Sequence, residues 1–487
     1  MLGVWFGFGM PEGVHSWAQS DRLSIALNFV DNYSFFEPRT HSLMSENGEV
    51  GVEFPLIQYI VAGFKRAIPG TNVSTLYRWV TGFFMTMGLA WFVASFRFHS
   101  SIRIPLFLLC LSPLALFYQF NFLPDGSALG LLLGSLGFLN RYLHGKGFKN
   151  ALLSVLLVGL ATLVKTSCGI FYISISSVFV IDLFFESQRR KGSIGAVIAA
   201  IAFGIFIYWY DLIHFFERNE QLWSVVFLSK PLPVKSWEEV VAIWKNTSTW
   251  RLDYLSFVQY TLLAAVLGTL ITRKKKLPSL IKDPSFRTLV ASAIGATIYS
   301  LLIGMQFSNH DYYFLCTFYP IFIWAILLGI KSLSNSTQLN IEVWKAVLFA
   351  LAIIHTGVSL HKAQSRRSEH YAVRDRVILN ETKWLNGSEE FLQQHGVPED
   401  SRIFVLCEFA PNTSLVYLQR KGKVFNHEEM SRERDHIDYW QDRIKPDYFI
   451  IRNKWLDHIP EKQPHLGNES ELLGANDHFS LFKFKKP

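Results

Sequence analysis

The sequence has little charge and little cysteine for its length. Only 18% of its 487 residues are charged, where an ordinary soluble protein has about 25%, and only 4 are cysteine. The small charged fraction argues against a purely soluble enzyme and against a disordered chain. The small number of cysteines argues against a scaffold held together by disulfides.

Short motifs of soluble nucleotide and hydrolase chemistry are also absent. The sequence contains no Walker loop, no G-x-G-x-x-G, no H-E-x-x-H, no G-x-S-x-G and no C-x-x-C. Soluble nucleotide chemistry therefore has no support.

Apolar and aromatic residues take the place of the missing charge. Half of the residues are hydrophobic, 15% are aromatic and 42 are phenylalanine. This composition predicts a polytopic membrane protein. The mean hydropathy of +0.21 is nevertheless low for a chain made only of membrane spans. A sizeable water-soluble part must therefore lower the average.

Ten segments are long and apolar enough, or nearly so, to cross the hydrocarbon core as helices, which takes about 20 residues. We therefore expect a multi-pass α-helical membrane domain over residues 1–360. The ten segments are Thr75–Phe96, Ile104–Phe120, Gly126–Leu143, Ala151–Val164, Gly169–Phe185, Ile194–Tyr210, Tyr254–Ile271, Leu289–Met305, Phe314–Ile330 and Val343–Leu360.

Lysine and arginine indicate which side of the membrane each connection faces. Alternate connections are rich in these residues, above all the stretch Arg273–Lys276, and the others are poor in them. The positive-inside rule puts the basic connections in the cytoplasm, so residues 11–74 and 361–487 lie outside. Because the basic connections supply much of the net charge of +8, we expect no nucleic-acid partner.

The first ten residues are apolar but far too short to span a membrane. They lack the basic start and the small-residue cleavage site of a signal peptide. Two interpretations are open. The segment is either a short interfacial anchor or the end of a first span, in which case the complete chain has about 11 spans.

The expected external segment of residues 11–74 is too long for a simple connector. Helical patterns begin near His15 and near Pro55, and we expect both helices to lie on the membrane surface. Asp21 lies near the start of the first helix among aromatic neighbours. A carboxylate there can act as a general base or bind a metal. The alternative is a carboxylate that only caps the helix or interacts with its dipole.

Three further groups of polar residues are expected at the same membrane face. Asp125 ends a very short turn, where it can also simply cap the next helix. Lys165 lies where two short spans meet, and it either functions there or extends to the interface. The third group precedes a later span and comprises His310, Asp311, Tyr312 and Tyr313.

Three more residues of the first external segment, Arg22, Arg39 and Glu53, can reach this surface. The cations suit a phosphate, and the carboxylates suit acid–base chemistry or a metal. These residues indicate no particular cofactor, and a divalent metal stays open. The side chains that could hold a divalent metal are Asp21, Glu53, His310 and Asp311.

The order of these motifs resembles that of the integral membrane glycosyltransferases of the GT-C class. Asp21, in a long first external segment, is followed by E-F-P-L from Glu53, by L-P-D ending at Asp125, by L-V-K ending at Lys165 and by H-D-Y-Y from His310. The branch with the strongest resemblance is the bacterial one related to the aminoarabinose transferase and the protein O-mannosyltransferases (glycosyltransferase family 39). The resemblance covers essentially the whole expected membrane region.

The resemblance implies a polyprenyl-phosphate-linked sugar as donor, used on the non-cytoplasmic face of the plasma or inner membrane, with inversion at the anomeric carbon. It implies that Asp21 is the base or orients the acceptor, and that Asp125 and Glu53 match the other acidic residues of the family. The positions that match contacts to the donor phosphate are Lys165, His310, Tyr312 and Tyr313.

The sequence departs from the family pattern beside Asp21. A second acidic residue is common there, whereas this chain has Ser20 before Asp21 and Arg22 after it. The departure leaves open whether a metal is used and whether Arg22 contacts the phosphate. The acceptor, which is a lipid, a glycan or a protein, is open as well.

The composition changes to that of a soluble domain from residue 361 onward. Apolar runs predict strands at Arg402–Phe409, Val424–Phe425, Tyr448–Arg452 and His478–Phe484, and helical patterns cover Glu381–His395 and Ser414–Arg420. We expect a small extracytoplasmic α/β domain over residues 361–487 with a largely parallel sheet. This domain either helps to select the acceptor, as GT-C tails often do, or only contributes stability.

Two other functions need many spans and lipid-linked sugar. A transporter or flippase usually carries its polar residues at mid-membrane, often with an internal repeat. A polysaccharide polymerase or ligase usually has a long external loop near its C-terminus. In this sequence the polar residues gather at one expected face, and the long loops are residues 11–74 and 211–253, so we favour the transferase.

Overall fold

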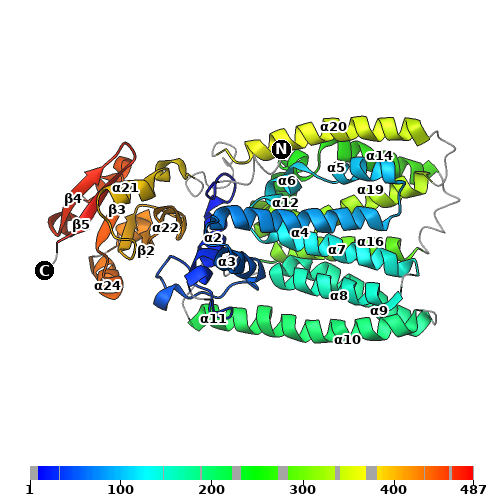
Figure 1. Ribbon diagram of the computed structural model, residues 1–487, viewed down its shortest axis with the longest axis horizontal. Coiled ribbons are helices and arrows are strands. Elements are labelled where there is room, and N and C mark those ends of the chain that lie inside the picture. Colours follow the sequence, from blue (N-terminus) through cyan, green and yellow to red (C-terminus); the bar gives the residue numbers. More distant parts are fainter. Residues whose placement is uncertain are drawn as a thin grey trace. The chain divides into compact units, whose positions relative to one another are not determined.

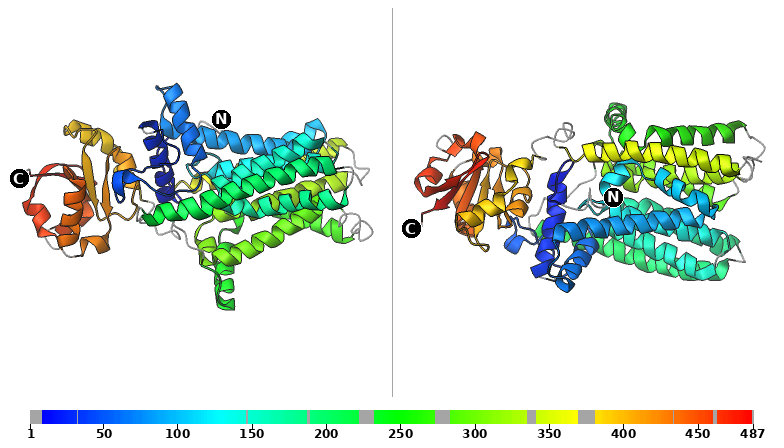
Figure 2. Two further views of the ribbon diagram at one scale, coloured as in Figure 1. Left: turned by 90° about the horizontal axis from the view of Figure 1, so that it is seen from below. Right: turned by 45° about the horizontal axis from the view of Figure 1, so that its top comes forward.

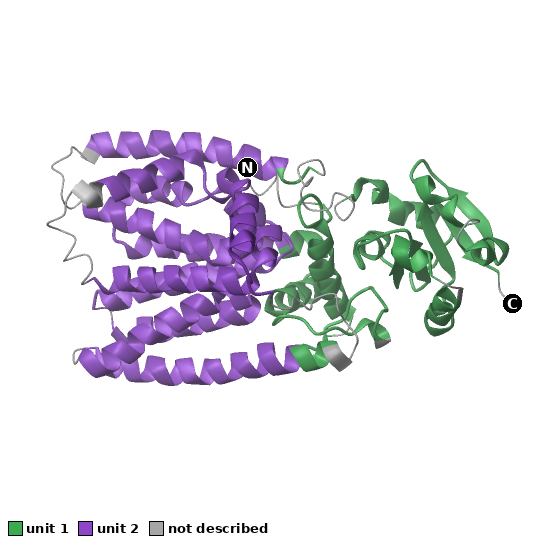
Figure 3. Ribbon diagram, turned by 180° about the vertical axis from the view of Figure 1, so that it is seen from behind, with its two compact units in different colours: residues 1–77, 216–228, 366–487 green, residues 78–215, 229–365 purple. Residues whose placement is uncertain are grey.

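The computed structural model describes the chain except residues 1–8, 32, 146, 187–188, 222–231, 273–282, 335–340, 369–380, 433, 460–462 and 486–487. The described residues form two compact units (Figure 3). Unit 1 comprises residues 1–77, 216–228 and 366–487, and unit 2 comprises residues 78–215 and 229–365. Nearly all of the apolar start and the basic stretch at 273–276 lie outside the described residues.

Unit 2 is helical throughout its described part, and its long helices run side by side (Figures 1 and 2). The elements before residue 215 are α4 (Val73–Ser95, which begins in unit 1), α5 (Ser100–Leu109), α6 (Pro113–Gln119), α7 (Asp125–Leu143), α8 (Gly147–Val164), the 3-10 turn η2 (Thr166–Cys168), α9 (Gly169–Phe185), α10 (Arg190–Ile207) and the π-helical turn η3 (Tyr208–His214). The later elements are α12 (Trp237–Ser248), α13 (Arg251–Tyr254), α14 (Phe257–Thr272), α16 (Pro284–Ile303), α17 (Met305–Asn309), α18 (Tyr312–Cys316), α19 (Phe318–Ser334) and α20 (Ile341–Ser365).

Every segment predicted to span the membrane lies in helical structure, but the count of about ten spans is not confirmed. By length and composition, five described helices could cross a membrane, and α5 with α6 would make a sixth that is bent by 89°. The apolar parts of α14 and α19 are shorter. The polar residues within α4 and α7, which include Arg78 and Asp125, lower the hydropathy of those helices.

Small residues allow the helices of unit 2 to approach closely. A Cβ on Gly88 of α4 would lie 1.8 Å from the carbonyl oxygen of Gly130 in α7, so the two backbones touch there. On the other side of α7, the Ser135 hydroxyl lies 2.7 Å from the Ser154 carbonyl oxygen of α8. Packing of small residues and hydroxyl bonds of this kind hold helices together where lipid removes the hydrophobic driving force.

Unit 1 combines the first segment of the chain with its tail. The first segment contains α2 (Ser16–Asp31), the short turn η1 (Glu46–Gly48) and α3 (Leu56–Ala67), and α11 (Phe215–Gln221) joins this unit for most of its length. α2 and α3 pack around a small apolar core that includes Ile25, Phe29 and Val52.

The tail is a five-stranded sheet with the order β2-β1-β3-β5-β4. Its elements are η7 (Lys383–Leu385), α21 (Ser388–Gln394), β1 (Arg402–Leu406), α22 (Thr413–Leu418), β2 (Lys421–Phe425), α23 (His427–Met430), α24 (Arg434–Ile444), β3 (Tyr448–Arg452), η8 (Asn453–Trp455), α26 (Pro464–Asn468), β4 (Ser470–Ala475) and β5 (Phe479–Phe484). Alternate side chains of β1 enter two apolar cores, with Ile403 on one face and Phe404 on the other.

The tail corrects two details of the sequence prediction. The sheet is mixed, because β2, β1 and β3 are parallel whereas β5 is antiparallel to both β3 and β4. The helix expected over Glu381–His395 is interrupted between η7 and α21, where Gly387 has a φ of 71° that a continuous helix cannot accommodate.

Within unit 1 the first segment pairs with the edge of this sheet. Ser42 forms a parallel bridge with Gly422 of β2, and Leu43 donates its backbone N–H to the Gly422 carbonyl over 2.7 Å. The Tyr417 hydroxyl donates to the Pro11 carbonyl over 2.7 Å. These bonds join residues that flank α2 to residues about 400 positions later in the chain.

Candidate functional site

Asp21 is a buried carboxylate in the second turn of α2. Only 1% of the residue is exposed, and one carboxylate oxygen, Oδ1, accepts a hydrogen bond of 2.8 Å from the Asn412 amide. Burial raises the pKa of Asp21 to about 7, against the opposing effects of the Asn412 hydrogen bond and the Arg22 charge. Because α2 begins at Ser16, Asp21 is not the capping residue that the alternative interpretation expected.

Asn412 holds the Asp21 carboxylate in relation to the rest of unit 1. It directly precedes α22, and its side-chain oxygen accepts a hydrogen bond of 2.9 Å from the Ser42 backbone N–H. With the amide oxygen engaged in this way, the NH₂ group points to Asp21. The sequence analysis did not predict this residue, and no local pattern marks a partner that lies 391 positions away.

Arg22 and Glu53 form an ion pair beside Asp21. The guanidinium Nη2 of Arg22 lies 2.7 Å from Glu53 Oε2, and both side chains are mostly buried. The structure thus brings three predicted residues of the first segment together. Asp21 is a carboxylate of raised pKa, Arg22 is the cation next to it in sequence, and Glu53 is a second carboxylate that holds Arg22 in place.

Arg39 lies in a separate charged cluster of unit 1. Its guanidinium is 3.0 Å from Glu49 and 3.7 Å from Glu37, and Arg218 also contacts Glu49 at 2.6 Å. Arg39 therefore already has two carboxylate partners, and a phosphate would have to compete with them.

His41 is a second buried polar group that the sequence analysis missed. Its Nδ1 lies 2.8 Å from the Ser24 hydroxyl and 3.1 Å from the Asn28 amide. Burial, followed by the nearby Lys421 charge, lowers the pKa of His41 to about 3, so the ring stays neutral. Ser24 also approaches Asn412, at 3.5 Å, so the neutral His41 supports the loop that presents Asn412 to Asp21.

Unit 2 contains a buried lysine among acidic and aromatic groups. Lys165 follows α8, and its ammonium lies 3.7 Å from an oxygen of Asp125, the first residue of α7. The same ammonium lies 4.9 Å from the ring centre of Tyr312 and 5.4 Å from that of Tyr313. Lys165 is only 7% exposed, so protein groups surround its side chain.

Asp311 and His310 complete this part of unit 2. The Tyr118 hydroxyl of α6 donates a hydrogen bond of 2.6 Å to Asp311, and the Tyr118 ring packs edge-on to Tyr312. His310 places Nδ1 3.1 Å from the Gln306 carbonyl oxygen, and its ring lies against Tyr312. The structure thus gathers Asp125, Lys165 and the H-D-Y-Y group, and it adds Tyr118, which the sequence analysis did not predict.

The side chains proposed to hold a metal each have polar partners already. Asp21 accepts from Asn412, Glu53 contacts Arg22, and Asp311 accepts from Tyr118. His310 Nδ1 lies 3.1 Å from the Gln306 carbonyl oxygen. In the described parts of the chain, three metal-ligating side chains come together elsewhere, at Cys407, His427 and His458.

Comparisons with known proteins bear on the fold. No protein-family model and no curated protein matches the chain. Among solved structures, ArnT from Cupriavidus metallidurans is similar over 99% of this chain and 96% of its own. The TM-score is 0.58 at 10% identity for the apo state, and 0.57 at 11% identity for ArnT bound to undecaprenyl phosphate.

An oligosaccharyltransferase from Archaeoglobus fulgidus, in its apo form, is also similar. The match has a TM-score of 0.48 at 10% identity, over 92% of this chain and 66% of that one. The ArnT structures alone carry the conclusion, since they match at higher scores over nearly the full length of both chains. The chain has the fold of the GT-C membrane glycosyltransferases.

Proposed function

We propose that the chain is a membrane glycosyltransferase that moves a sugar from a polyprenyl-phosphate-linked donor to an acceptor, with inversion. The observation that carries the proposal is the fold shared with ArnT, a protein solved with undecaprenyl phosphate bound, over nearly the full length of both chains. The buried, polar clusters around Asp21 and Lys165 support it, because each has the chemistry that one part of such a reaction needs.

The donor phosphate is assigned to the Lys165 cluster of unit 2. As the bond between the anomeric carbon and the phosphate oxygen breaks, negative charge grows on the leaving phosphate. The Lys165 ammonium and the hydroxyls of Tyr312 and Tyr313 stabilise that charge, with His310 as a further donor. Asp125, at 3.7 Å from Lys165, acts through the lysine by holding the ammonium in place.

Asp21 is assigned the role of general base, which takes the proton of the acceptor. A general base works best when its pKa lies near the working pH, and burial raises the pKa of Asp21 to about 7. As the acceptor oxygen or nitrogen bonds to the anomeric carbon, its proton passes to Asp21, and the electron pair of the broken bond leaves with the phosphate. Glu53 acts through Arg22, which it holds beside Asp21 at 2.7 Å, and Arg22 and Arg39 are assigned further phosphate contacts.

The test is transfer in vitro from a panel of defined polyprenyl-phosphate sugars, with and without a chelator. Asp21→Asn should abolish transfer while the protein still inserts into membranes, and Asp31→Asn, at the exposed end of the same helix, should leave transfer intact. Full activity of the Asp21→Asn variant contradicts the assigned base. If no donor supports transfer but lipid-linked sugar crosses vesicles that contain the protein, the chain is a transporter instead.

The proposal also assigns a side of the membrane. The reaction would take place outside the cytoplasm, at the plasma or inner membrane. The connections rich in lysine and arginine are expected in the cytoplasm, and the residues assigned to transfer lie in or beside the connections of the other side. Labelling of single cysteines introduced at exposed positions such as Asp31, by a reagent that does not cross membranes, tests this assignment in intact cells. Protection of Asp31→Cys from the reagent would contradict it.

A further inference from the structure

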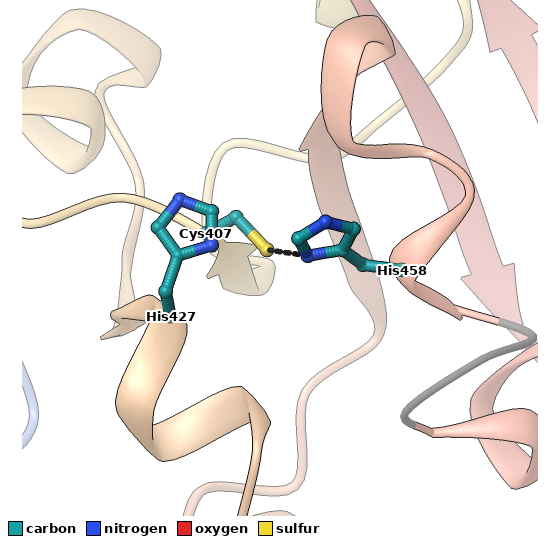
Figure 4. Close-up of side chains that lie close together, drawn as sticks. All are labelled: Cys407, His427 and His458. Carbon is teal, nitrogen blue, oxygen red and sulfur yellow. Dashed lines mark hydrogen bonds between the residues drawn. The ribbon is translucent and has the colours of Figure 1, made fainter.

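A cluster of metal-ligating side chains lies in the tail, away from the residues assigned to transfer. Cys407 directly follows β1, His427 follows β2, and His458 follows β3 by way of η8 (Figure 4). These three strands are adjacent and parallel, so their carboxyl ends meet at one edge of the sheet. The strand order reverses at β1, and such a switch point is where open α/β sheets bind ligands.

The three side chains point toward one another with nearly the spacing of metal ligands. One ligand atom from each lies within 4.8 Å of the others, and Cys407 Sγ is 4.0 Å from His458 Nδ1. In a tetrahedral zinc site, with Zn–S at about 2.3 Å and Zn–N at about 2.0 Å, neighbouring ligand atoms are about 3.5 Å apart. Small shifts of these side chains would therefore close the cluster around an ion.

The surrounding structure holds the cluster in shape. Cys407 is buried and has a φ of 61°, a left-handed conformation that is costly for a residue with a side chain and that recurs at ligand sites. The Trp455 ring lies edge-on to His427, with centroids 4.4 Å apart, and 5.1 Å from the His458 ring. The two imidazoles are thus packed against one aromatic side chain with the thiol between them.

We propose that Cys407, His427 and His458 form a transition-metal site, with Zn²⁺ as the probe ion. One thiolate and two imidazoles select Zn²⁺ and its soft or borderline relatives over Mg²⁺ and Ca²⁺. Binding releases the thiol proton to solvent, and the fourth coordination position is open to water or an outside ligand. The ion ties together the segments that follow β1, β2 and β3. This proposal does not depend on the transferase assignment.

The experiment uses the full chain in detergent, with any affinity tag removed and after treatment with a chelator. Titration with Co²⁺ should produce a thiolate-to-cobalt charge-transfer band that saturates at one ion per chain. Zn²⁺ should displace the band, whereas Mg²⁺ and Ca²⁺ should not. Cys407→Ser should remove the band, and His427→Ala and His458→Ala should each weaken binding at least tenfold. His478→Ala, an exposed histidine of the same domain, should bind as the unmodified chain does.

A second measurement avoids substitutions. Zn²⁺ should slow alkylation of Cys407 in the unmodified chain. Mass spectrometry of the peptide that contains Cys407 measures the rate, and this peptide is distinct from those of the other three cysteines, which lie in unit 2. A charge-transfer band that persists in the Cys407→Ser variant, the absence of any band, or alkylation of Cys407 at the same rate with and without Zn²⁺ would each overturn the proposal.

Discussion

The Asp21 cluster of unit 1 and the Lys165 cluster of unit 2 surround a buried ionisable side chain with different partners. Asp21 contacts a neutral amide, and its pKa rises to about 7, so the carboxyl can gain or lose a proton near neutral pH. Lys165 lies 3.7 Å from a carboxylate oxygen and near two tyrosine rings, whose faces attract a cation. The first environment suits proton transfer, and the second suits lasting attraction of an anion.

The largest effect is expected from removing the base. Asp21→Asn keeps the shape of the side chain but cannot accept a proton, so transfer should fall on the order of 100- to 10,000-fold. Initial rates at saturating donor measure the loss, and Asp31→Asn provides the matched control on the same helix. A similar loss in both variants would mean that α2 is merely perturbed.

The next largest effect is expected from Lys165, and it tests whether this residue binds the phosphate or only balances the charge of Asp125. Lys165→Met leaves the buried Asp125 carboxylate without the nearby ammonium, which should cost about 3 kcal/mol of stability and abolish transfer. In the Lys165→Met/Asp125→Asn double variant, stability should largely return because no buried charge is left over. Thermal unfolding in detergent and the transfer assay are compared. Recovery of transfer along with stability would show that Lys165 does not bind the phosphate.

A smaller effect tests the amide beside Asp21. In the unmodified chain, transfer should rise with pH through about 7, as Asp21 loses its proton. Asn412→Ala removes a hydrogen bond to the charged carboxylate, so the pKa of Asp21 should rise further and the pH profile should move upward by about one unit. Ser24→Ala disturbs the same network one residue further from Asp21 and should move the profile less. An unchanged profile for Asn412→Ala would contradict the assigned role of Asp21.

The same raised pKa predicts how stability depends on pH. Folded Asp21 holds its proton up to about pH 7, whereas the unfolded carboxyl loses it near 3.8, so this group favours folding less and less as pH rises between those values. The unfolding temperature in detergent should therefore decline over this window more steeply in the unmodified chain than in the Asp21→Asn variant. Parallel declines would mean that other groups govern the dependence.

The smallest effect concerns Arg39. Because Glu37 and Glu49 already partner it, Arg39→Ala should raise the donor KM only a few-fold. Arg218 contacts the same Glu49, so Arg218→Ala is the matched control and should leave the donor KM unchanged. If the donor KM changes equally in both variants, the cause is loss of the Glu49 ion pairs, and Arg39 does not contact the phosphate.

Local patterns predicted much of the fold. Long apolar runs marked the helical segments of unit 2, and short apolar runs marked β1, β2, β3 and β5 in the tail. β4 and α24 were missed. β4 is mostly exposed. α24 is polar overall, although its few apolar residues, Ile437, Trp440 and Ile444, recur at helical spacing and pack into the tail. The mixed sheet also escaped prediction, since the direction of β5 follows from its pairing with β3 and not from its own residues.

In the candidate site, too, local patterns predicted some residues and missed others. Residue type and order marked Asp21, Asp125, Lys165 and the H-D-Y-Y group as polar residues among apolar surroundings. Their partners did not stand out, because Asn412 and Tyr118 are ordinary residues in their local sequence. What makes Asn412 special is its contact with a carboxylate 391 positions away, and such a contact exists only after folding.

Residue composition was enough to predict a helical membrane protein with a tail of different composition, because the balance of apolar and charged residues governs which solvent each segment prefers. Folding is what brings particular polar groups into the same environment. Burial of Asp21, enclosure of Lys165 by tyrosine rings, and convergence of Cys407, His427 and His458 all depend on contacts between distant segments. Protonation and metal affinity depend on those surroundings and not on residue type alone.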